Sequence, residues 1–310
     1  MESEDRLIEI FKRFETPKRR IIGKIGDDCA YISEKSGCLI ALSVDTQIEG
    51  VHFKREWLSP FHIGYRAMAS ALSDLAAKGA KPLLALVDLH LSPNENEEFI
   101  YHLYKGMHAL SMKFGFSIAG GNISKSKVFS LSITVAGEIK AGGVPKRSGA
   151  RKGDYVYLTG DVGRCRLFLE LVDREEIPEA VSLKFKSPMP RFKLMWSVFS
   201  QYKVTSSIDI SDGLGKDAER LARASGVDIY IYENQVPLHP VLKRYGKNAV
   251  FAIESGEEYE VMFTSKDFIK KRDVTLIGEV RNGNGKAFLI THSGKKIEIG
   301  ESGFDHFRQV

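Results

Sequence analysis

The chain has 310 residues, a formal net charge of +5 and 43% hydrophobic residues, enough for one large domain or two of ordinary size. No apolar run approaches the ~20 residues that a membrane-spanning helix needs, and the charged N-terminus (residues 1–6) lacks a signal-peptide core. These features exclude a membrane protein and favour a location in the cytoplasm.

The cysteine and basic residues exclude further classes of protein. Cys29, Cys38 and Cys165 are far apart and form no CxxC pair, so we expect no disulfide framework and no zinc site. Lys and Arg are spread along the chain, and the densest basic run is residues 18–20. Nucleic-acid binders usually gather basic residues on one stripe, so we expect no nucleic-acid partner. A mild positive charge equally suits an enzyme that attracts anionic phosphates.

The first half of the chain predicts alternating helices and strands. An amphipathic helix is expected over residues 5–14. Ser59-Pro60 and Ser92-Pro93 each resemble an N-cap followed by proline, so helices should begin there and end near Gly79 and Lys113. Strands are expected over residues 39–44, 116–119 and 128–139.

The Gly-rich stretch 142–153 is the best candidate for a domain boundary, between residues 1–140 and residues 150–310. Beyond it, strands are expected over 155–159, 206–210, 258–264 and 274–280, and helices over 163–172, 190–199 and 213–224. Strands and helices in both halves predict two α/β (α+β) domains, each with helices packed on a mixed sheet.

Aspartates recur in Gly- or Ser-flanked turns at the edges of apolar runs, in both halves of the chain. The segments are Gly26-Asp27-Asp28, Ser43-Val44-Asp45, Ser73-Asp74 and Asp209-Ile210-Ser211-Asp212-Gly213. If these edges converge, each carboxylate pair ~4 Å apart repels by roughly 4 kcal/mol at an effective dielectric of ~20. Cations must then hold the cluster together, and an oxygen-only donor set suits Mg²⁺, which in proteins usually serves phosphate chemistry.

Each segment also has a plainer interpretation. Asp27-Asp28 could be a simple turn, and Asp212 could only cap the following helix. A charge at Asp74, inside a helix that otherwise looks buried, is costly unless it is paired or bound to metal. Gly120-Gly121 after a strand allows close approach to a ligand, or is a tight turn.

Other candidates are equally open. Arg147 suits a polyphosphate but could be a solvated surface residue. His52 could bind substrate or lie half-buried. Strand alternation would send Glu258 and Glu260 to one face, which could also be solvated. No P-loop, GxGxxG, HExxH, GxSxG or CxxC motif occurs, so any phosphate must be held by metals and scattered donors.

Over nearly its whole length the chain resembles the thiamine-monophosphate kinase family, in the superfamily of aminoimidazole ribonucleotide synthetase and selenophosphate synthetase. The resemblance is carried by the following segments: Gly26–Ala30, Ser43–Asp45, Glu49–Phe53, Ala71–Pro82, Gly120–Asn122, Arg147–Ala150, Asp209–Leu214, Gly256–Glu260 and Gly303–Phe307. It implies the superfamily's two-domain architecture, a homodimer built through the N-terminal domains, and Mg²⁺-assisted in-line transfer of the ATP γ-phosphate to thiamine monophosphate.

The resemblance also implies residue roles. Metal ligands would be Asp27, Ser43, the Val44 carbonyl, Asp45, Asp74, Asn122, Asp209 and Asp212. Nucleotide contacts would come from Tyr104, Gly121, Asn122, Arg147 and Ser211, and contacts to thiamine monophosphate from His52, Glu258 and Phe304. No protein nucleophile is implied, because the acceptor is already an ionised phosphate.

Two positions depart from the family pattern. Asn122 and Glu258 stand where the family often has Asp. Asn122 would therefore remove one negative charge from a metal site, and the longer side chain of Glu258 would change the reach of one substrate contact. The alternatives are another enzyme of the superfamily, or a non-catalytic nucleotide or nucleic-acid binder that shows salt-sensitive binding and no ATP turnover.

Overall fold

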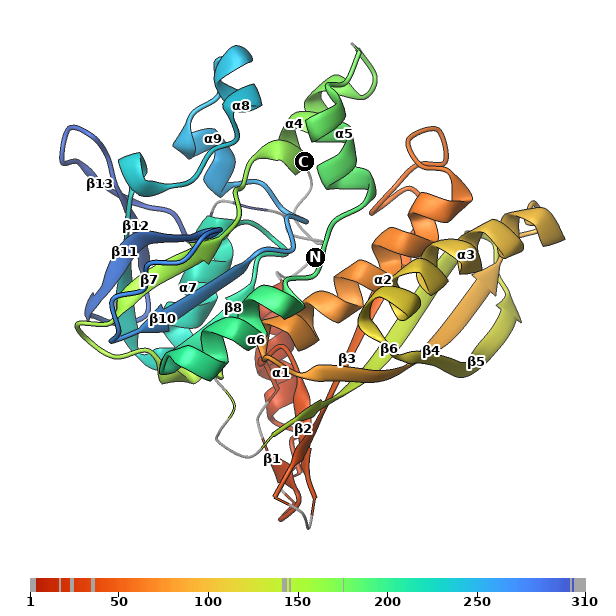
Figure 1. Ribbon diagram of the computed structural model, residues 1–310, viewed down its shortest axis with the longest axis horizontal. Coiled ribbons are helices and arrows are strands. Elements are labelled where there is room, and N and C mark those ends of the chain that lie inside the picture. Colours follow the sequence, from red (N-terminus) through yellow and green to blue (C-terminus); the bar gives the residue numbers. More distant parts are fainter. Residues whose placement is uncertain are drawn as a thin grey trace.

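The computed structural model describes residues 4–16, 18–22, 25–34, 37–140, 144, 146–174, 176–301 and 303. Within these residues the strands form a six-stranded and a seven-stranded sheet, with helices packed between and around them (Figure 1). The expected mixed α/β architecture is therefore confirmed. In the same part of the chain, no helix combines the length and apolarity required to cross a membrane.

The first sheet is built from the N-terminal half of the chain. Its strand order is β1 (Ile21–Ile22), β2 (Ala30–Ser33), β3 (Leu39–Ile48), β6 (Ser130–Ile139), β4 (Lys81–Leu91) and β5 (Ser117–Lys125). Neighbouring strands are antiparallel except for β4 and β5. This topology leaves β5 as an edge strand, separated from β3 by two other strands.

Two long helices, α2 (Pro60–Ala77) and α3 (Glu97–Phe114), pack together on one face of this sheet (Figure 1). Helix α2 begins as predicted, with Ser59 as N-cap and Pro60 in the first turn. The predicted start of α3 at Ser92-Pro93 is wrong. The Ser92 hydroxyl donates to Glu95, and Asn96 is the N-cap, accepting a hydrogen bond from the Phe99 N–H.

The second sheet belongs to the C-terminal half. Its strand order is β13 (Lys296–Glu298), β12 (Ala287–Ile290), β9 (Val227–Tyr232), β11 (Val274–Asn282), β7 (Tyr155–Thr159), β10 (Val261–Ser265) and β8 (Val204–Asp209). The remaining helices are α1 (Glu4–Lys12), α4 (Arg164–Leu171), α5 (Glu179–Lys186), α6 (Phe192–Gln201), α7 (Leu214–Ser225), α8 (Pro240–Arg244) and α9 (Ala249–Ile253), with short 3₁₀ turns η1 (Arg147–Gly149) and η2 (Glu233–Gln235).

Two strand predictions need correction. The strand expected from Glu258 begins at Val261, because Glu257 and Tyr259 have left-handed backbone angles (φ 58° and 50°) that interrupt an extended chain. The Gly120-Gly121 pair lies inside β5 rather than after a strand. A Cβ on Gly121 would lie 1.7 Å from the Val87 carbonyl oxygen, so this glycine allows β5 to approach β4 closely.

Helix α2 is the element that joins the two units. One side contacts β3, β6 and α3, and another contacts β8, α5 and α6 of the second unit (Figure 1). Nearly every residue from Ile63 to Ala77 is buried, Asp74 being only partly so. The C-terminal end of α2 therefore lies against the end of β8, where the predicted aspartates of both halves meet. The predicted boundary near residues 142–153 stays a prediction, and residues 141–143 and 145 lie outside the described part.

Candidate metal and phosphate site

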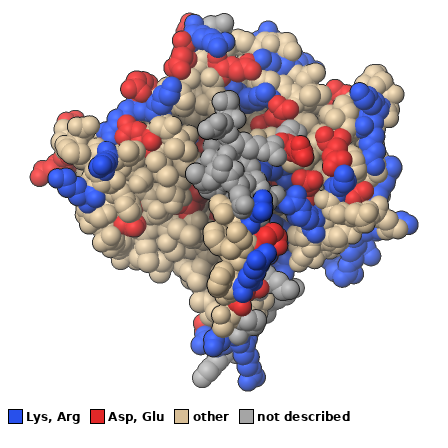
Figure 2. All heavy atoms as spheres, turned by 180° about the vertical axis from the view of Figure 1, so that it is seen from behind, with Lys and Arg blue, Asp and Glu red and all other residues tan. Residues whose placement is uncertain are grey.

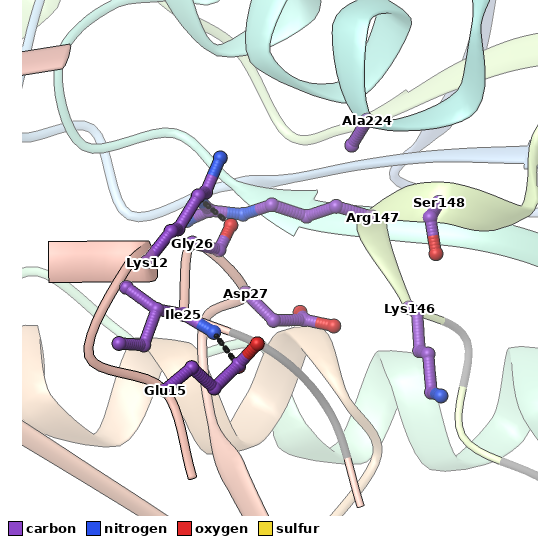
Figure 3. A pocket seen from close by; sticks show the side chains of 9 residues that line it. All are labelled: Lys12, Glu15, Ile25, Gly26, Asp27, Lys146, Arg147, Ser148 and Ala224. Carbon is purple, nitrogen blue, oxygen red and sulfur yellow. Dashed lines mark hydrogen bonds between the residues drawn. The ribbon is translucent and has the colours of Figure 1, made fainter. Parts of the chain in front are cut away.

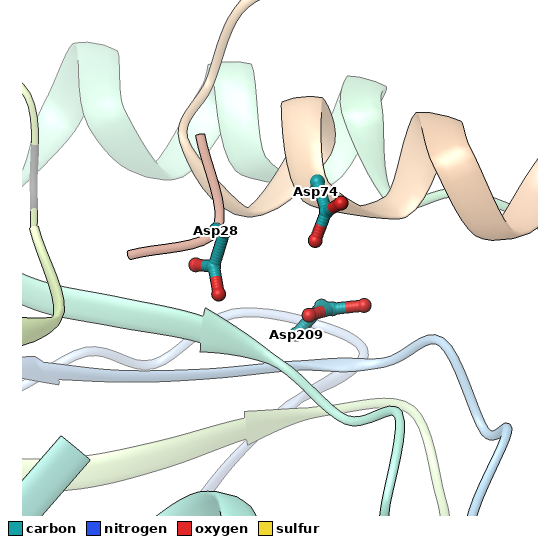
Figure 4. A group of neighbouring side chains, drawn as sticks. All are labelled: Asp28, Asp74 and Asp209. Atoms are coloured by element: carbon teal, nitrogen blue, oxygen red, sulfur yellow. The ribbon is translucent and has the colours of Figure 1, made fainter. Parts of the chain in front are cut away.

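Three carboxylates from distant parts of the chain meet at the junction of the two units. Asp28 precedes β2, Asp74 lies in the last turns of α2, and Asp209 ends β8. One oxygen from each lies within 4.8 Å of the others (Figure 4). The convergence predicted from sequence is therefore present, with Asp28 rather than Asp27 as the member from the first turn.

The electrostatics of this cluster are those of carboxylates without enough positive charge. Burial raises the pKa of Asp209 to about 8, with Asp28 and Asp217 adding to the effect. Burial also raises the pKa of Asp74 well above its ordinary value, and the neighbouring Asp209 and Asp28 raise it further. Asp74 accepts a short hydrogen bond (2.5 Å) from the Ser43 hydroxyl. Without a divalent cation, Asp209 would therefore be largely protonated near neutral pH.

One end of the cluster is rich in protein cations. The fully buried Lys78 Nζ lies 2.9 Å from Asp27 and 2.7 Å from Asp28. Arg147 donates from Nε to Asp28 (2.6 Å) and from Nη1 to the Gly26 carbonyl (2.9 Å). Burial alone would raise the pKa of Asp28, but Arg147 and Lys78 outweigh it and hold that pKa below its ordinary value. The sequence did not reveal this role of Lys78, because a lysine at the C-terminus of a helix is common and usually only stabilises the helix dipole.

The opposite end is poorer in cations. Asp45 on β3 accepts the Thr46 N–H (2.8 Å). Burial raises its pKa, the Ser70 hydroxyl on α2 and the Thr46 N–H lower it, and the charged groups that act on it most strongly are His52 and Glu257. His52 Nδ1 accepts the Ile48 N–H (3.1 Å), which leaves Nε2 as the nitrogen that carries the proton in the neutral ring. The site is therefore polarised, with Arg147 and Lys78 acting on Asp28, and His52 and Glu257 as the charged groups that act most strongly on Asp45.

The donor chemistry fits hard divalent cations. The converging ligand atoms are all oxygens, and the raised pKa values of Asp74 and Asp209 mark carboxylates that a divalent ion would stabilise. Cys29 is adjacent in sequence, but burial raises the pKa of its thiol well above the ordinary value, so it stays protonated and is a poor ligand. The residues present therefore suit Mg²⁺.

The loop before α7 adds a further acidic group. Asp217 Oδ2 accepts the N–H groups of Ser211, Asp212 and Gly213 at 3.0, 3.1 and 3.2 Å. The Asp212 side chain pairs with Arg220 (2.6 Å) and Lys216 (3.2 Å) and takes no part in the three-carboxylate group. Asp217 therefore holds the 211–213 backbone in place beside Asp209, a role that its first-turn position did not reveal.

Several predicted site residues are not brought to the cluster within one copy of the chain. In register across the first sheet, Thr46 pairs with Ser132, Ser132 with Asp88, and Asp88 with Asn122. Directly paired residues point to the same face, so Asn122 lies on the opposite face from Asp45. Three strand spacings of about 4.8 Å also separate β5 from β3 by about 14 Å.

Asn122, Gly121, Tyr104 and the Val44 side chain have surroundings other than the carboxylate cluster. The Asn122 amide donates to Asp88 Oδ1 (3.0 Å), and Gly121 fits against β4. Tyr104 on α3 packs against the apolar core, and burial raises its pKa. The Val44 side chain is 62% exposed on the outer face of β3.

Glu258, which the resemblance assigns to thiamine monophosphate, lies against the start of α4. It is 1% exposed, and its Oε1 accepts the Gly163 N–H (2.7 Å) and the Cys165 N–H (3.2 Å) at the start of α4. Glu257, paired with the buried Arg66, is the carboxylate of this segment that acts on Asp45. Phe304 lies outside the described residues.

Comparisons with known proteins agree with this architecture. Residues 26–139 match the family model for "AIR synthase related protein, N-terminal domain". The chain is 34% identical to the thiamine-monophosphate kinase of Aquifex aeolicus over 97% of both chains, and 31% identical to that of Bacillus subtilis over 92% of this chain and 93% of its relative. The chain belongs to the thiamine-monophosphate kinase family. A solved structure of AaThiL complexed with AMPPCP and TMP superposes with a TM-score of 0.87 at 33% identity, covering 98% of this chain and 97% of the other.

Proposed function

We propose that this protein transfers the γ-phosphate of ATP to thiamine monophosphate and forms thiamine diphosphate. The observation that carries the proposal is the three-carboxylate group at the junction of the two units. Arg147 and Lys78 lie at one end of this group, and Asp45 lies towards the other. The named activity of the relatives and the ligands of the similar solved structure support it.

The polarity of the site suits the two substrates. Arg147 offers a guanidinium to the negatively charged phosphates of a nucleotide. Asp45 and Glu257 place carboxylates where the positively charged thiazolium ring of thiamine would be stabilised. The chain's own residues hold the two substrates in line, and no general base is required because the acceptor phosphate is already ionised.

We propose Mg²⁺ as the cofactor, held by Asp28, Asp74 and Asp209 together with the family ligands Asp27, Ser43, Asp45 and Asp212. When bound, the metal neutralises the repulsion between the two sets of phosphates. The chain's residues prepare this site. Ser43 orients Asp74, and Asp217 fixes the loop that carries Ser211 and Asp212.

We also propose a homodimer formed through the outer face of the first sheet. Helices α2 and α3 cover the other face, and Val44 and Leu86 are 62% and 42% exposed on this one. In Figure 2, which views the molecule from behind, the left-hand part where this sheet lies has a broad, mostly uncharged central area, with charged side chains along its left and upper edge. A second copy across this face could supply the Gly121 and Asn122 that one copy keeps away from its own cluster. Leu86→Lys should then yield monomers in analytical ultracentrifugation, and an unchanged dimer would remove this face as the interface.

A cytoplasmic location is part of the same proposal, and the three free cysteines support a reducing compartment. The test of the reaction is product analysis after incubation with ATP, Mg²⁺ and thiamine monophosphate, with free thiamine as a parallel acceptor. We expect thiamine diphosphate from the monophosphate alone, and none in EDTA. ATP binding without any product would overturn the assigned acceptor.

A further inference from the structure

A pocket of about 580 Å³ lies beside the cation-rich end of the aspartate cluster (Figure 3). Its volume is within the range of about 300–1,000 Å³ that is typical of small-molecule sites. One wall is the Gly26–Asp27 turn and another is Lys146–Ser148. The third wall comes from the N-terminal segment, through Lys12 and Glu15, which neither the motifs nor the roles implied by the family resemblance include.

The N-terminal segment is fastened to the metal-binding turn. The Glu15 carboxylate accepts the Ile25 N–H at 2.8 Å, as the dashed line in Figure 3 shows. Ile25 directly precedes Gly26, whose carbonyl accepts from Arg147. Glu15 in the segment after α1, the Ile25–Gly26 turn and Arg147 are therefore linked by consecutive hydrogen bonds.

Lys12, the last residue of α1, is held over this turn. A Cβ on Gly26 would lie 3.5 Å from Lys12 Cε and 3.8 Å from its Nζ, so the lysine stem covers the glycine closely. Its ammonium pairs with Glu9 (2.6 Å) while 41% of the side chain remains exposed. Such a surface pair contributes little stability, about 0–1 kcal/mol, so the ammonium can turn to a more strongly charged partner. Lys146, across the pocket, makes no ion pair with any described carboxylate.

We propose that Lys12 is a phosphate-binding residue of the nucleotide site and that Glu15 positions it there. This inference rests on the proposed function. The pocket presents Lys12, Lys146 and Arg147 beside Asp27, which is the combination that receives the phosphates of a metal-bound nucleotide. The thiazolium end of the acceptor is disfavoured in this pocket, because the positively charged ring would face three basic side chains.

The experiment compares Lys12→Met with Arg13→Met, its exposed neighbour that does not line the pocket. ADP and a non-hydrolysable ATP analogue are titrated in the presence of Mg²⁺ by calorimetry, and KM is measured for ATP and for thiamine monophosphate. We expect Lys12→Met to weaken nucleotide binding and raise the KM for ATP by about tenfold, the loss of one charge-assisted hydrogen bond. The KM for thiamine monophosphate should not change, Lys12→Arg should restore most of the affinity, and Arg13→Met should resemble the parent.

The positioning role of Glu15 has its own readout. Glu15→Gln keeps an oxygen that can accept the Ile25 N–H, so it should bind nucleotide nearly as well as the parent, whereas Glu15→Ala should share the defect of Lys12→Met. Unchanged ADP affinity in Lys12→Met, or a rise confined to the KM for thiamine monophosphate, would overturn the assignment. Because nucleotide binding is measured without turnover, these results remain interpretable if the protein phosphorylates a different acceptor.

Discussion

Lys78 and Ser207 are tied together across the junction of the two units. The Lys78 ammonium donates to the Ser207 carbonyl (2.8 Å), and the Ser207 hydroxyl donates to the carbonyl of Ala77, the residue before Lys78 (2.7 Å). The same ammonium neutralises Asp27 and Asp28. One buried lysine therefore holds both the end of α2 against β8 and the cation-rich end of the site.

Replacing this lysine should be strongly destabilising. Lys78→Met leaves Asp27 without its cation, Asp28 with Arg147 alone, and one buried carbonyl without its donor. We expect a loss of about 3–5 kcal/mol in the free energy of unfolding. Urea denaturation measures the loss, and Lys81→Met, which changes an exposed lysine at the start of β4, is the matched control. Equal stability of the two variants would contradict a structural role for Lys78.

Asp74→Asn should raise the stability of the metal-free protein and abolish its activity. Burial and the neighbouring carboxylates raise the pKa of Asp74 well above its ordinary value, so the charged form is disfavoured in the folded protein. In EDTA at neutral pH the variant should melt at a higher temperature than the parent, because an amide replaces a poorly compensated carboxylate. Phosphate transfer should be abolished, and Asp45→Asn should abolish it too. Near-normal activity in either variant would disprove the metal cluster.

Glu260 should make the protein sensitive to acid. Burial alone would raise its pKa, but Lys184 and Arg191 outweigh burial and lower it. A depressed folded-state pKa contributes stability that is complete above the unfolded value of about 4.3 and is lost as the pH falls through the folded value. Glu260→Gln should therefore be destabilised by about 3–5 kcal/mol at pH 7, with the gap from the parent narrowing below about pH 4.

Urea denaturation of both proteins across this pH range checks the prediction. Glu279→Gln is the control, since Glu279 pairs with Arg281 at the surface and such pairs contribute about 0–1 kcal/mol. A gap between Glu260→Gln and the parent that is independent of pH would show that the carboxylate charge is not the source of the stability.

Gly121→Ala and Gly120→Ala form a matched pair in β5. Both glycines have positive φ angles, 155° and 151°, so both substitutions strain the backbone. Only Gly121 would place its Cβ against backbone, 1.7 Å from the Val87 oxygen, whereas the Cβ at Gly120 meets only Leu86 Cδ2 at 3.8 Å. We expect Gly121→Ala to be less stable by a further amount of about 1–3 kcal/mol in denaturation without nucleotide. Equal losses would refute the close-packing role.

Sequence reasoning succeeded where local chemistry decides the outcome. Ser59 and Pro60 begin α2 as predicted, because capping depends on adjacent residues. It failed at Ser92, where the nearby Glu95 competes for the hydroxyl. It also failed at the start of β10, which the positive φ angles of Glu257 and Tyr259 delay to Val261.

The residues of the candidate site also divide into those that local sequence reveals and those that depend on the tertiary structure. Asp74 was singled out as a charge inside an otherwise apolar helix and Asp209 as a charge at the end of a strand, and the structure brings these two carboxylates together. The role of Asp45 stays a prediction. The choice between Asp27 and Asp28 depends on which side chain the turn at Gly26 sends inward, and Asn122 depends on the register of four strands, so neither follows from local sequence.

The burial of α2 on nearly all sides means that the two halves of this chain are units of topology but not of autonomous folding. An excised N-terminal half would carry a helix whose apolar side towards β8, α5 and α6 has no cover, and an excised C-terminal half would lack the helix that closes it. Dissection into fragments should therefore yield insoluble or molten pieces, and complementation should require both fragments in the same refolding mixture.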